Sequence, residues 1–202
     1  MTRTDPISAD EALRRLIEGN ERFVRGEARF PTMQKEILTQ LAHGQEPYAL
    51  ILGCSDSRVP PELIFDAGFG ALFVVRVAGN VFSPEAMGSI QYAAVHLGTT
   101  LFVVLGHTGC GAVQAALDAK LHDVRERAHI QKLVDDILPG LRDIDPQISP
   151  SLQLARAVEA NVRWSMRQIL ETPEAQARVA EGRVKLVGGI FDIASGHVSF
   201  LS

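Results

Sequence analysis

The stretch Tyr48-Ala-Leu-Ile-Leu-Gly-Cys54-Ser-Asp-Ser-Arg58 decides the fold class of this chain, because a short, almost continuous apolar run ends abruptly in polar residues. Two further runs of the same kind occupy residues 72–77 and 100–105. Near-continuous apolar runs of this length are typical of strands that are covered on both faces of a parallel sheet. The three runs therefore predict strands that are covered on both faces of such a sheet.

The segments between and after these runs predict how the strands connect. Ser83-Pro84-Glu85 has the form of a helix start, and helical periodicity continues as far as Gly98. A strand, a helix and a strand in this order predict a parallel crossover unit. Residues 184–193, a Ser195-Gly196 turn and residues 197–201 predict a long strand followed by a closing strand, so we expect a mixed sheet with an antiparallel edge.

Further helices are predicted on both sides of the central strands. Ser8 followed by Glu11 has the form of a capping box, which predicts an amphipathic helix that runs to about Arg25. The other predicted helices are residues 32–42, a helix that begins near Cys110, residues 123–137 and residues 152–170, and residues 139–150 are expected to form a long exposed loop.

These elements together predict an α/β fold: a mixed, mainly parallel central β-sheet flanked by helices, with an N-terminal helical arm. The chain has 202 residues, of which 46% are hydrophobic, and this is enough to bury one substantial core. We therefore expect a single domain over residues 1–202.

Composition and charge exclude several classes of function. The chain carries 20 Lys and Arg against 24 Asp and Glu, and no segment gathers basic residues into the stripe that nucleic-acid binding requires. No run approaches the roughly 18 apolar residues of a membrane helix, and residues 1–6 lack the apolar stretch of an export signal. We therefore expect a soluble, cytoplasmic protein with neither nucleic-acid nor membrane partners.

The chain contains two cysteines, Cys54 and Cys110, and both follow predicted strands. His107 stands three residues before Cys110 in the glycine-rich segment 106–111, which allows a tight strand-to-helix turn. If the two strands lie close together in a parallel sheet, their carboxyl ends bring the three side chains to one edge. Two Cys and one His suit zinc and leave a fourth position open, which is the pattern of catalytic rather than structural zinc.

Asp56 and Arg58 alternate with Cys54, so in extended backbone the three side chains point the same way. Asp56 is placed to accept a hydrogen bond beside the metal, and Arg58 can hold the Asp56 carboxylate as a bidentate partner. Without that restraint Asp56 could become a fourth ligand. The remaining histidines lack such neighbours and are expected to be surface or core residues: His43, His96, His122, His129 and His197.

These residues resemble the β-class carbonic anhydrases. The resemblance rests on Cys54-Ser-Asp-Ser-Arg-Val-Pro-Pro-Glu62, on Phe73-Val-Val-Arg-Val-Ala-Gly-Asn80 and on Gly106-His-Thr-Gly-Cys-Gly-Ala112, and it extends over most of the chain. It implies reversible hydration of carbon dioxide to bicarbonate and a proton by zinc-bound hydroxide, with one Zn²⁺ per subunit. It also implies a homo-oligomer, dimer or tetramer, with the helical arm of residues 1–45 at the dimer interface.

Residue by residue, the resemblance implies that Cys54, His107 and Cys110 bind zinc, and that Asp56 and Arg58 form a catalytic dyad. Asp56 would be the conditional fourth ligand of the family's closed, inactive form. Some members also carry a regulatory bicarbonate pocket built on a Trp, an Arg and a Tyr. Ile51, Arg76 and Phe191 stand at those places here, and because Arg76 alone matches, we expect this regulation to be missing.

Two alternatives remain open from the sequence. A hydrolase of carbonyl sulfide or carbon disulfide uses the same ligand types on a similar scaffold, so motifs do not separate it from a carbonic anhydrase. A zinc-stabilised redox-sensing or interaction module would use the cysteines as structural or oxidisable groups. That second alternative gives no role to Asp56 and Arg58.

Overall fold

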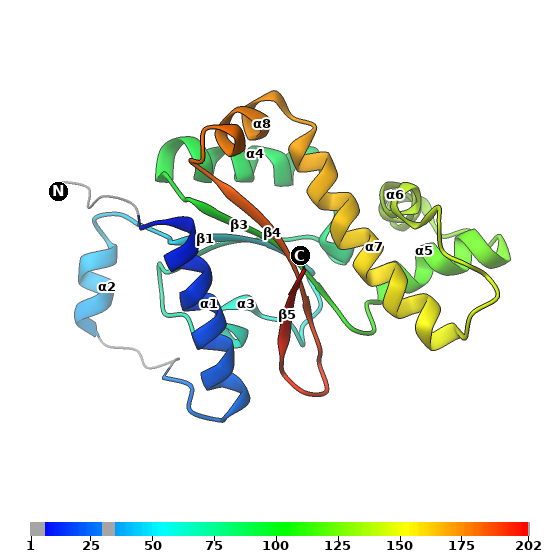
Figure 1. The fold of residues 1–202 in the computed structure, drawn as a ribbon, viewed down its shortest axis with the longest axis horizontal. Helices are drawn as coiled ribbons and strands as arrows, with labels where there is room; N and C mark the ends of the chain where they lie inside the picture. Colours follow the sequence, from blue (N-terminus) through cyan, green and yellow to red (C-terminus); the bar gives the residue numbers. More distant parts are fainter. Residues whose placement is uncertain (1–6, 30–34, 202) are drawn as a thin grey trace.

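The computed structural model describes residues 7–29 and 35–201, and its centre is a five-stranded sheet with the strand order β2-β1-β3-β4-β5 (Figure 1). The first four strands in this order run parallel, and β5 pairs antiparallel with β4. The predicted mixed, mainly parallel sheet with an antiparallel edge is thus confirmed. The strands are β1 (Ala49–Gly53), β2 (Leu72–Arg76), β3 (Leu101–His107), β4 (Lys185–Phe191) and β5 (Val198–Leu201).

Helices cover both faces of this sheet. Every residue of β1 and β3 is buried, which is why their sequences are apolar without alternation. On one face Ile51 and Val103 belong to a core shared with the N-terminal helix, and on the other Leu50 and Leu52 pack with the helix that begins at Pro84. The helices are α1 (Ala9–Val24), α2 (Lys35–Leu41), α3 (Pro61–Ile64), α4 (Pro84–Tyr92), α5 (Gly111–His122), α6 (Ala128–Ile137), α7 (Pro150–Leu170) and α8 (Pro173–Ala180).

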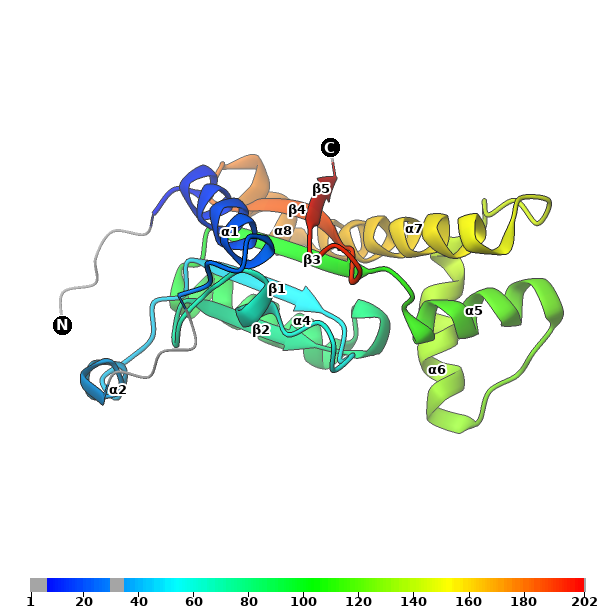
Figure 2. The ribbon, with the colours of Figure 1, turned by 90° about the horizontal axis from the view of Figure 1, so that it is seen from below.

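Three short turns of other helix types complete the architecture: η1 (Ala78–Asn80), η2 (Ala93–Leu97) and η3 (Leu138–Leu141). The η2 segment is a π-helical continuation of α4, and it ends at Gly98 in the left-handed conformation, as the glycine predicted. Helices α5 and α6 extend beyond the carboxyl ends of the strands (Figure 2). This places them around the sheet edge at which the candidate site was expected.

The N-terminal helix begins where the capping box predicts. The Ser8 side chain accepts a hydrogen bond of 3.1 Å from the backbone N–H of Glu11. The predicted helix of residues 32–42 is found as α2, and its first part, residues 32–34, lies outside the described residues.

The region between α5 and α7 differs from the prediction. Asp123 adopts a left-handed conformation with φ of 53° and ends α5, so α6 begins at Ala128 and not at residue 123. Residues 139–150 are not simply an exposed loop, because Leu141 and Ile144 are buried. The Lys120 ammonium donates hydrogen bonds to the carbonyls of both residues, at 2.6 and 3.1 Å, and so holds this connection in place.

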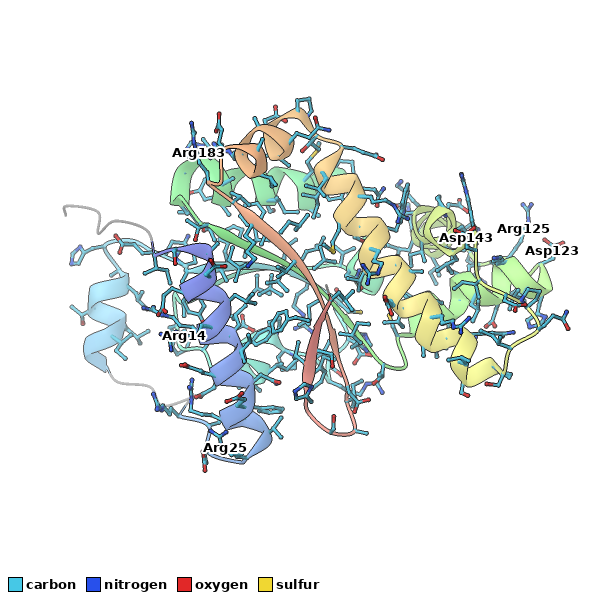
Figure 3. The ribbon with its side chains drawn as sticks, in the orientation of Figure 1. Arg14, Arg25, Asp123, Arg125, Asp143 and Arg183 are labelled. Atoms are coloured by element: carbon cyan, nitrogen blue, oxygen red, sulfur yellow. The ribbon has the colours of Figure 1, made fainter. Side chains whose placement is uncertain are left out.

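Charged side chains lie at the periphery of the fold. Figure 3 labels six of them, none of which belongs to a strand: Arg14, Arg25, Asp123, Arg125, Asp143 and Arg183. Within the described residues, no helix combines the length and the apolar character that crossing a membrane would need, although α7 has 21 residues.

Candidate metal centre

The candidate site forms at the carboxyl ends of β1 and β3. Because Gly53 pairs with Leu105 in the parallel register, Cys54 leaves β1 close to the point where β3 ends at His107. Gly109, with φ of 67°, then turns the chain so that Cys110 becomes the N-cap of α5. The ligand atoms of Cys54, His107 and Cys110 lie within 4.8 Å of one another, and all three residues are buried. The predicted convergence of two strand ends is therefore present.

The His107 ring is fixed in one tautomer. Its Nδ1 lies 3.0 Å from the Thr108 carbonyl oxygen, which can only accept, so Nδ1 carries the proton and donates it. Its Nε2 is then a bare acceptor, and among the described residues it is the one buried side-chain nitrogen or oxygen without a hydrogen-bond partner. Buried polar atoms are rarely left unsatisfied. A metal ion next to Nε2 would satisfy it, as in histidine sites whose other ring nitrogen binds a carbonyl.

The two thiols are free and close together, with 4.0 Å between their sulfur atoms. The two sulfurs share a hydrogen bond, and this lowers the pKa of Cys54 although burial opposes the shift. The same shared proton and burial raise the pKa of Cys110. Without metal, one thiolate therefore sits beside one thiol. A divalent cation between the sulfurs would displace the remaining proton and let both bind as thiolates.

Backbone N–H groups also surround the Cys54 sulfur. The N–H of Asp56 lies 3.4 Å from it and the N–H of Gly79 lies 3.3 Å from it. Such donors stabilise a thiolate and tune it as a metal ligand. The first contact follows from the local turn, whereas the second comes from the segment after β2.

Asp56 and Arg58 form the predicted bidentate pair. Arg58 donates from Nε to Oδ1 of Asp56 at 2.9 Å and from Nη2 to Oδ2 at 2.7 Å. This pair holds the pKa of Asp56 well below its usual range, so the carboxylate stays ionised. Its Oδ2 lies 3.9 Å from Nε2 of His107, which places an acceptor directly beside the three candidate ligands.

Arg76 takes part in the site in a way that the sequence analysis did not foresee. From the end of β2, its Nε donates to the carbonyl of Cys54 at 2.9 Å. Its Nη2 donates to the carbonyl of Asp56 at 2.6 Å, which is a short hydrogen bond. Ile51 and Phe191, the other two positions of the expected regulatory pocket, are buried in β1 and β4. Arg76 therefore clasps the loop that carries Cys54 and Asp56.

One group of side chains in the described part of the chain could share a metal ion. Within residues 7–29 and 35–201, Cys54, His107 and Cys110 are the one group of three or more His, Cys, Asp or Glu side chains close enough to share a metal ion. His96 instead packs against the ring of Tyr92, with 4.9 Å between ring centroids. A soft donor set of two sulfurs and one imidazole, with a carboxylate held back beside it, suits zinc with an open position. Fold and site together define an α/β protein with a buried Cys-His-Cys group that could hold a metal ion at the carboxyl ends of its parallel strands.

Comparisons with known proteins agree with this class. A family model described as carbonic anhydrase matches residues 49–198. Carbonic anhydrase 2 of Mycobacterium tuberculosis is 38% identical over 209 residues, which cover 98% of this chain and 93% of that protein. The carbonic anhydrase of Mycolicibacterium smegmatis is 36% identical over 215 residues, which cover 100% of this chain and 96% of that protein. This chain belongs to the carbonic anhydrase family.

Solved structures place it in the β class of that family. The β-carbonic anhydrase CcaA has a TM-score of 0.75 at 29% identity, and the match covers 94% of this chain and 95% of that one. A tetrameric β-carbonic anhydrase from Sordaria macrospora has a TM-score of 0.76 at 25% identity, with 95% and 98% covered. The resemblance found in the sequence motifs is thus confirmed.

Proposed function

We propose that this chain catalyses the reversible hydration of carbon dioxide to bicarbonate and a proton, with one Zn²⁺ per subunit bound by Cys54, His107 and Cys110. The observation that carries the proposal is the buried, unpartnered Nε2 of His107, which faces two sulfurs 4.0 Å apart. If the cysteines only packed in the core or formed a disulfide, the buried Nε2 of His107 would have neither a hydrogen-bond partner nor a metal ion beside it.

Zinc bound there would supply a water of lowered pKa as the nucleophile. Asp56 has the chemistry to orient that nucleophile, because an ionised carboxylate can only accept hydrogen bonds. Arg58 keeps Asp56 ionised, and its two-point contact holds the carboxylate away from the ligand position that Asp56 could otherwise occupy. Arg76 donates to the carbonyls of Cys54 and Asp56 and so fixes the positions of these two residues relative to each other.

The test is a direct hydration assay on the zinc-loaded wild type and on Asp56→Asn. The amide keeps the shape of the side chain but loses the charge and one acceptor. We expect the turnover of carbon dioxide to fall by about a hundredfold or more, within the usual range for a lost proton-handling group, while zinc content stays the same. Full activity in Asp56→Asn would remove Asp56 from the mechanism.

The same assay separates the related substrates. The named relatives are carbonic anhydrases, which supports carbon dioxide over carbonyl sulfide or carbon disulfide as the substrate. We therefore expect the wild type to turn over carbon dioxide faster than carbonyl sulfide when both are measured on one preparation. The opposite order would contradict the proposed substrate without affecting the proposed zinc site.

A further inference from the structure

The short turn η1 follows β2 and lies beside the candidate metal centre. Its backbone conformation is unusual. Gly79 has φ of 69° and Asn80 has φ of 47°, so two successive residues are left-handed. The left-handed conformation favours glycine at the first position, where a Cβ would also crowd Cδ1 of Ile137 at 2.8 Å and Cβ of Ala112 at 3.1 Å. A conformation of this kind persists only when its surroundings hold it.

The contacts that hold η1 come from the middle of α7. Nδ2 of Asn161 donates to the Gly79 carbonyl at 2.7 Å, and the Ser165 hydroxyl donates to the Asn80 carbonyl at 3.0 Å. Both α7 residues are 1% exposed. Being four residues apart, they lie on the same face of the helix, so they grip two consecutive carbonyls of the turn.

The backbone N–H of Gly79 points at the candidate metal centre. The Gly79 N–H lies 3.3 Å from the Cys54 sulfur, so this residue is bound to α7 through its carbonyl and to a candidate ligand through its amide. A left-handed glycine has no side chain to fix its orientation. Its N–H and its carbonyl belong to adjacent peptide planes that meet at its Cα, so with φ at 69° a hold on the carbonyl limits the directions in which the N–H can point.

We propose that Asn161 is a positioning residue for the metal centre: it aims the Gly79 N–H at Cys54 and so tunes the sulfur as a ligand. The inference rests on the proposed function, since it takes Cys54 to be a zinc ligand. Hydrogen bonds to a ligating sulfur control its charge and its hold on the metal, and loss of outer contacts commonly weakens a site by about ten- to a hundredfold.

The competing explanation is that Asn161 only satisfies a buried carbonyl and stabilises the fold. Asn20 provides a matched control, because it is a similarly buried asparagine, 3% exposed, whose backbone partners Ile64, Gly196 and Val198 make no hydrogen bond to a candidate ligand. Its Nδ2 donates to the Gly196 carbonyl at 2.8 Å, and its Oδ1 accepts from the Val198 N–H at 2.8 Å. Asn20→Ala should cost stability without changing the metal centre.

The experiment measures zinc release from the zinc-loaded wild type, Asn161→Ala and Asn20→Ala to a coloured chelator present in excess. We expect release to be about tenfold faster in Asn161→Ala and within about twofold of the wild type in Asn20→Ala. Cobalt-substituted protein gives a second readout. Its sulfur-to-metal charge-transfer band should shift in Asn161→Ala and stay unchanged in Asn20→Ala.

Equal release rates and identical cobalt spectra for Asn161→Ala and wild type would overturn the inference. If Asn161→Ala does not fold, Ser165→Ala decides, because it removes one hydroxyl from the same grip; severalfold faster release supports the inference and wild-type release overturns it. A wild type that retains no zinc would instead refute the proposed function. Zinc retention and hydration activity in the wild type, with unchanged variants, would refute the inference alone.

Discussion

Cys110 keeps its proton in the metal-free protein because the neighbouring Cys54 sulfur accepts it. Zinc must displace this proton in order to bind both sulfurs, so protons and zinc compete for the site. Since the pKa of Cys110 is raised, the competition persists through neutral pH, and zinc affinity should rise with pH. For one released proton we expect about a tenfold gain in affinity per pH unit.

Competition with a chelator of known affinity, over a series from about pH 6 to about pH 8, measures this slope. Proton release into a weak buffer on adding zinc gives an independent count. Cys110→Ser serves as the control, because it should lose most of the affinity and the slope with it. A pH-independent zinc affinity in the wild type would show that both sulfurs are already ionised.

Arg76 carries a second prediction at the level of single residues. Its Nε and Nη2 donate to the carbonyls of Cys54 and Asp56, so the guanidinium already holds the loop of the candidate site. Ile51 and Phe191, at the other two positions, are apolar and buried, so neither can supply a side-chain hydrogen bond to an anion. We expect bicarbonate to inhibit hydration as a simple product, with no cooperativity.

Initial rates over a bicarbonate series test this expectation. Strong cooperative inhibition in the wild type that disappears in Arg76→Ala would show that Arg76 does serve a regulatory bicarbonate pocket. The zinc content of both proteins should be measured alongside, because Arg76→Ala also loosens the loop between Cys54 and Asp56.

The sequence was sufficient to predict that Cys54, His107 and Cys110 meet and that Asp56 pairs with Arg58, and insufficient to predict the contacts that support them. Asp56 and Arg58 pair through alternation along one strand end, which is a local pattern. The contacts made by Arg76 and by Gly79 depend on how β2 lies beside β1, and that register is invisible along a single segment. Asn161 gave one usable signal, since it and Ser165 are polar residues on a helix face that also carries Ala157 and Val158.

At the level of elements, α1 packs unusually close to the body of the protein. A Cβ on Gly19 would lie 1.9 Å from the Phe65 carbonyl oxygen, so the helix touches backbone at this point. Gly19→Ala must push α1 away or break the contact, and we expect the free energy of unfolding to fall by about 2 kcal/mol.

Urea unfolding measures this loss, and Gly88→Ala is the matched control. Gly88 lies inside α4, and nothing is found within 4 Å of where its Cβ would stand. Alanine should stabilise the helix there by up to about 1 kcal/mol. Equal effects of the two substitutions would mean that α1 is not held at Gly19.

Helix α8 shows why some elements escape prediction. It has no buried residue, so it carries no apolar periodicity, and the sequence analysis passed over it. The available signal was at its start, where the Thr172 side chain caps the Ala175 N–H ahead of Pro173. The strands were easier, because burial on both faces makes β1 and β3 apolar throughout.

At the level of the whole molecule, β2 is an edge strand. Within residues 7–29 and 35–201 it pairs with β1 alone, and its first four residues are only partly buried. Large apolar side chains are exposed nearby, with Phe69 at 58%, Tyr92 at 47% and Val95 at 54%. Edges of parallel sheets are rarely left open to solvent, and exposed apolar groups favour association.

We therefore expect the chain to form a dimer or a tetramer. Light scattering coupled to size exclusion should give two or four times the chain mass of 22.0 kDa. One of the solved relatives is described as tetrameric. A stable mass of 22.0 kDa at high protein concentration would contradict the prediction. Cytoplasmic location remains a prediction from the sequence.

The centre draws its sulfurs from points 56 residues apart in the chain, brought together only when β1 and β3 lie side by side. In the unfolded chain the three ligands are therefore not held close together. Nascent chains emerging from the ribosome would have to complete their long-range pairings before loading, which is the slow part of assembling such topologies. Zinc would then bind at the end of folding. A cell short of zinc would accumulate folded, metal-free protein rather than misfolded protein.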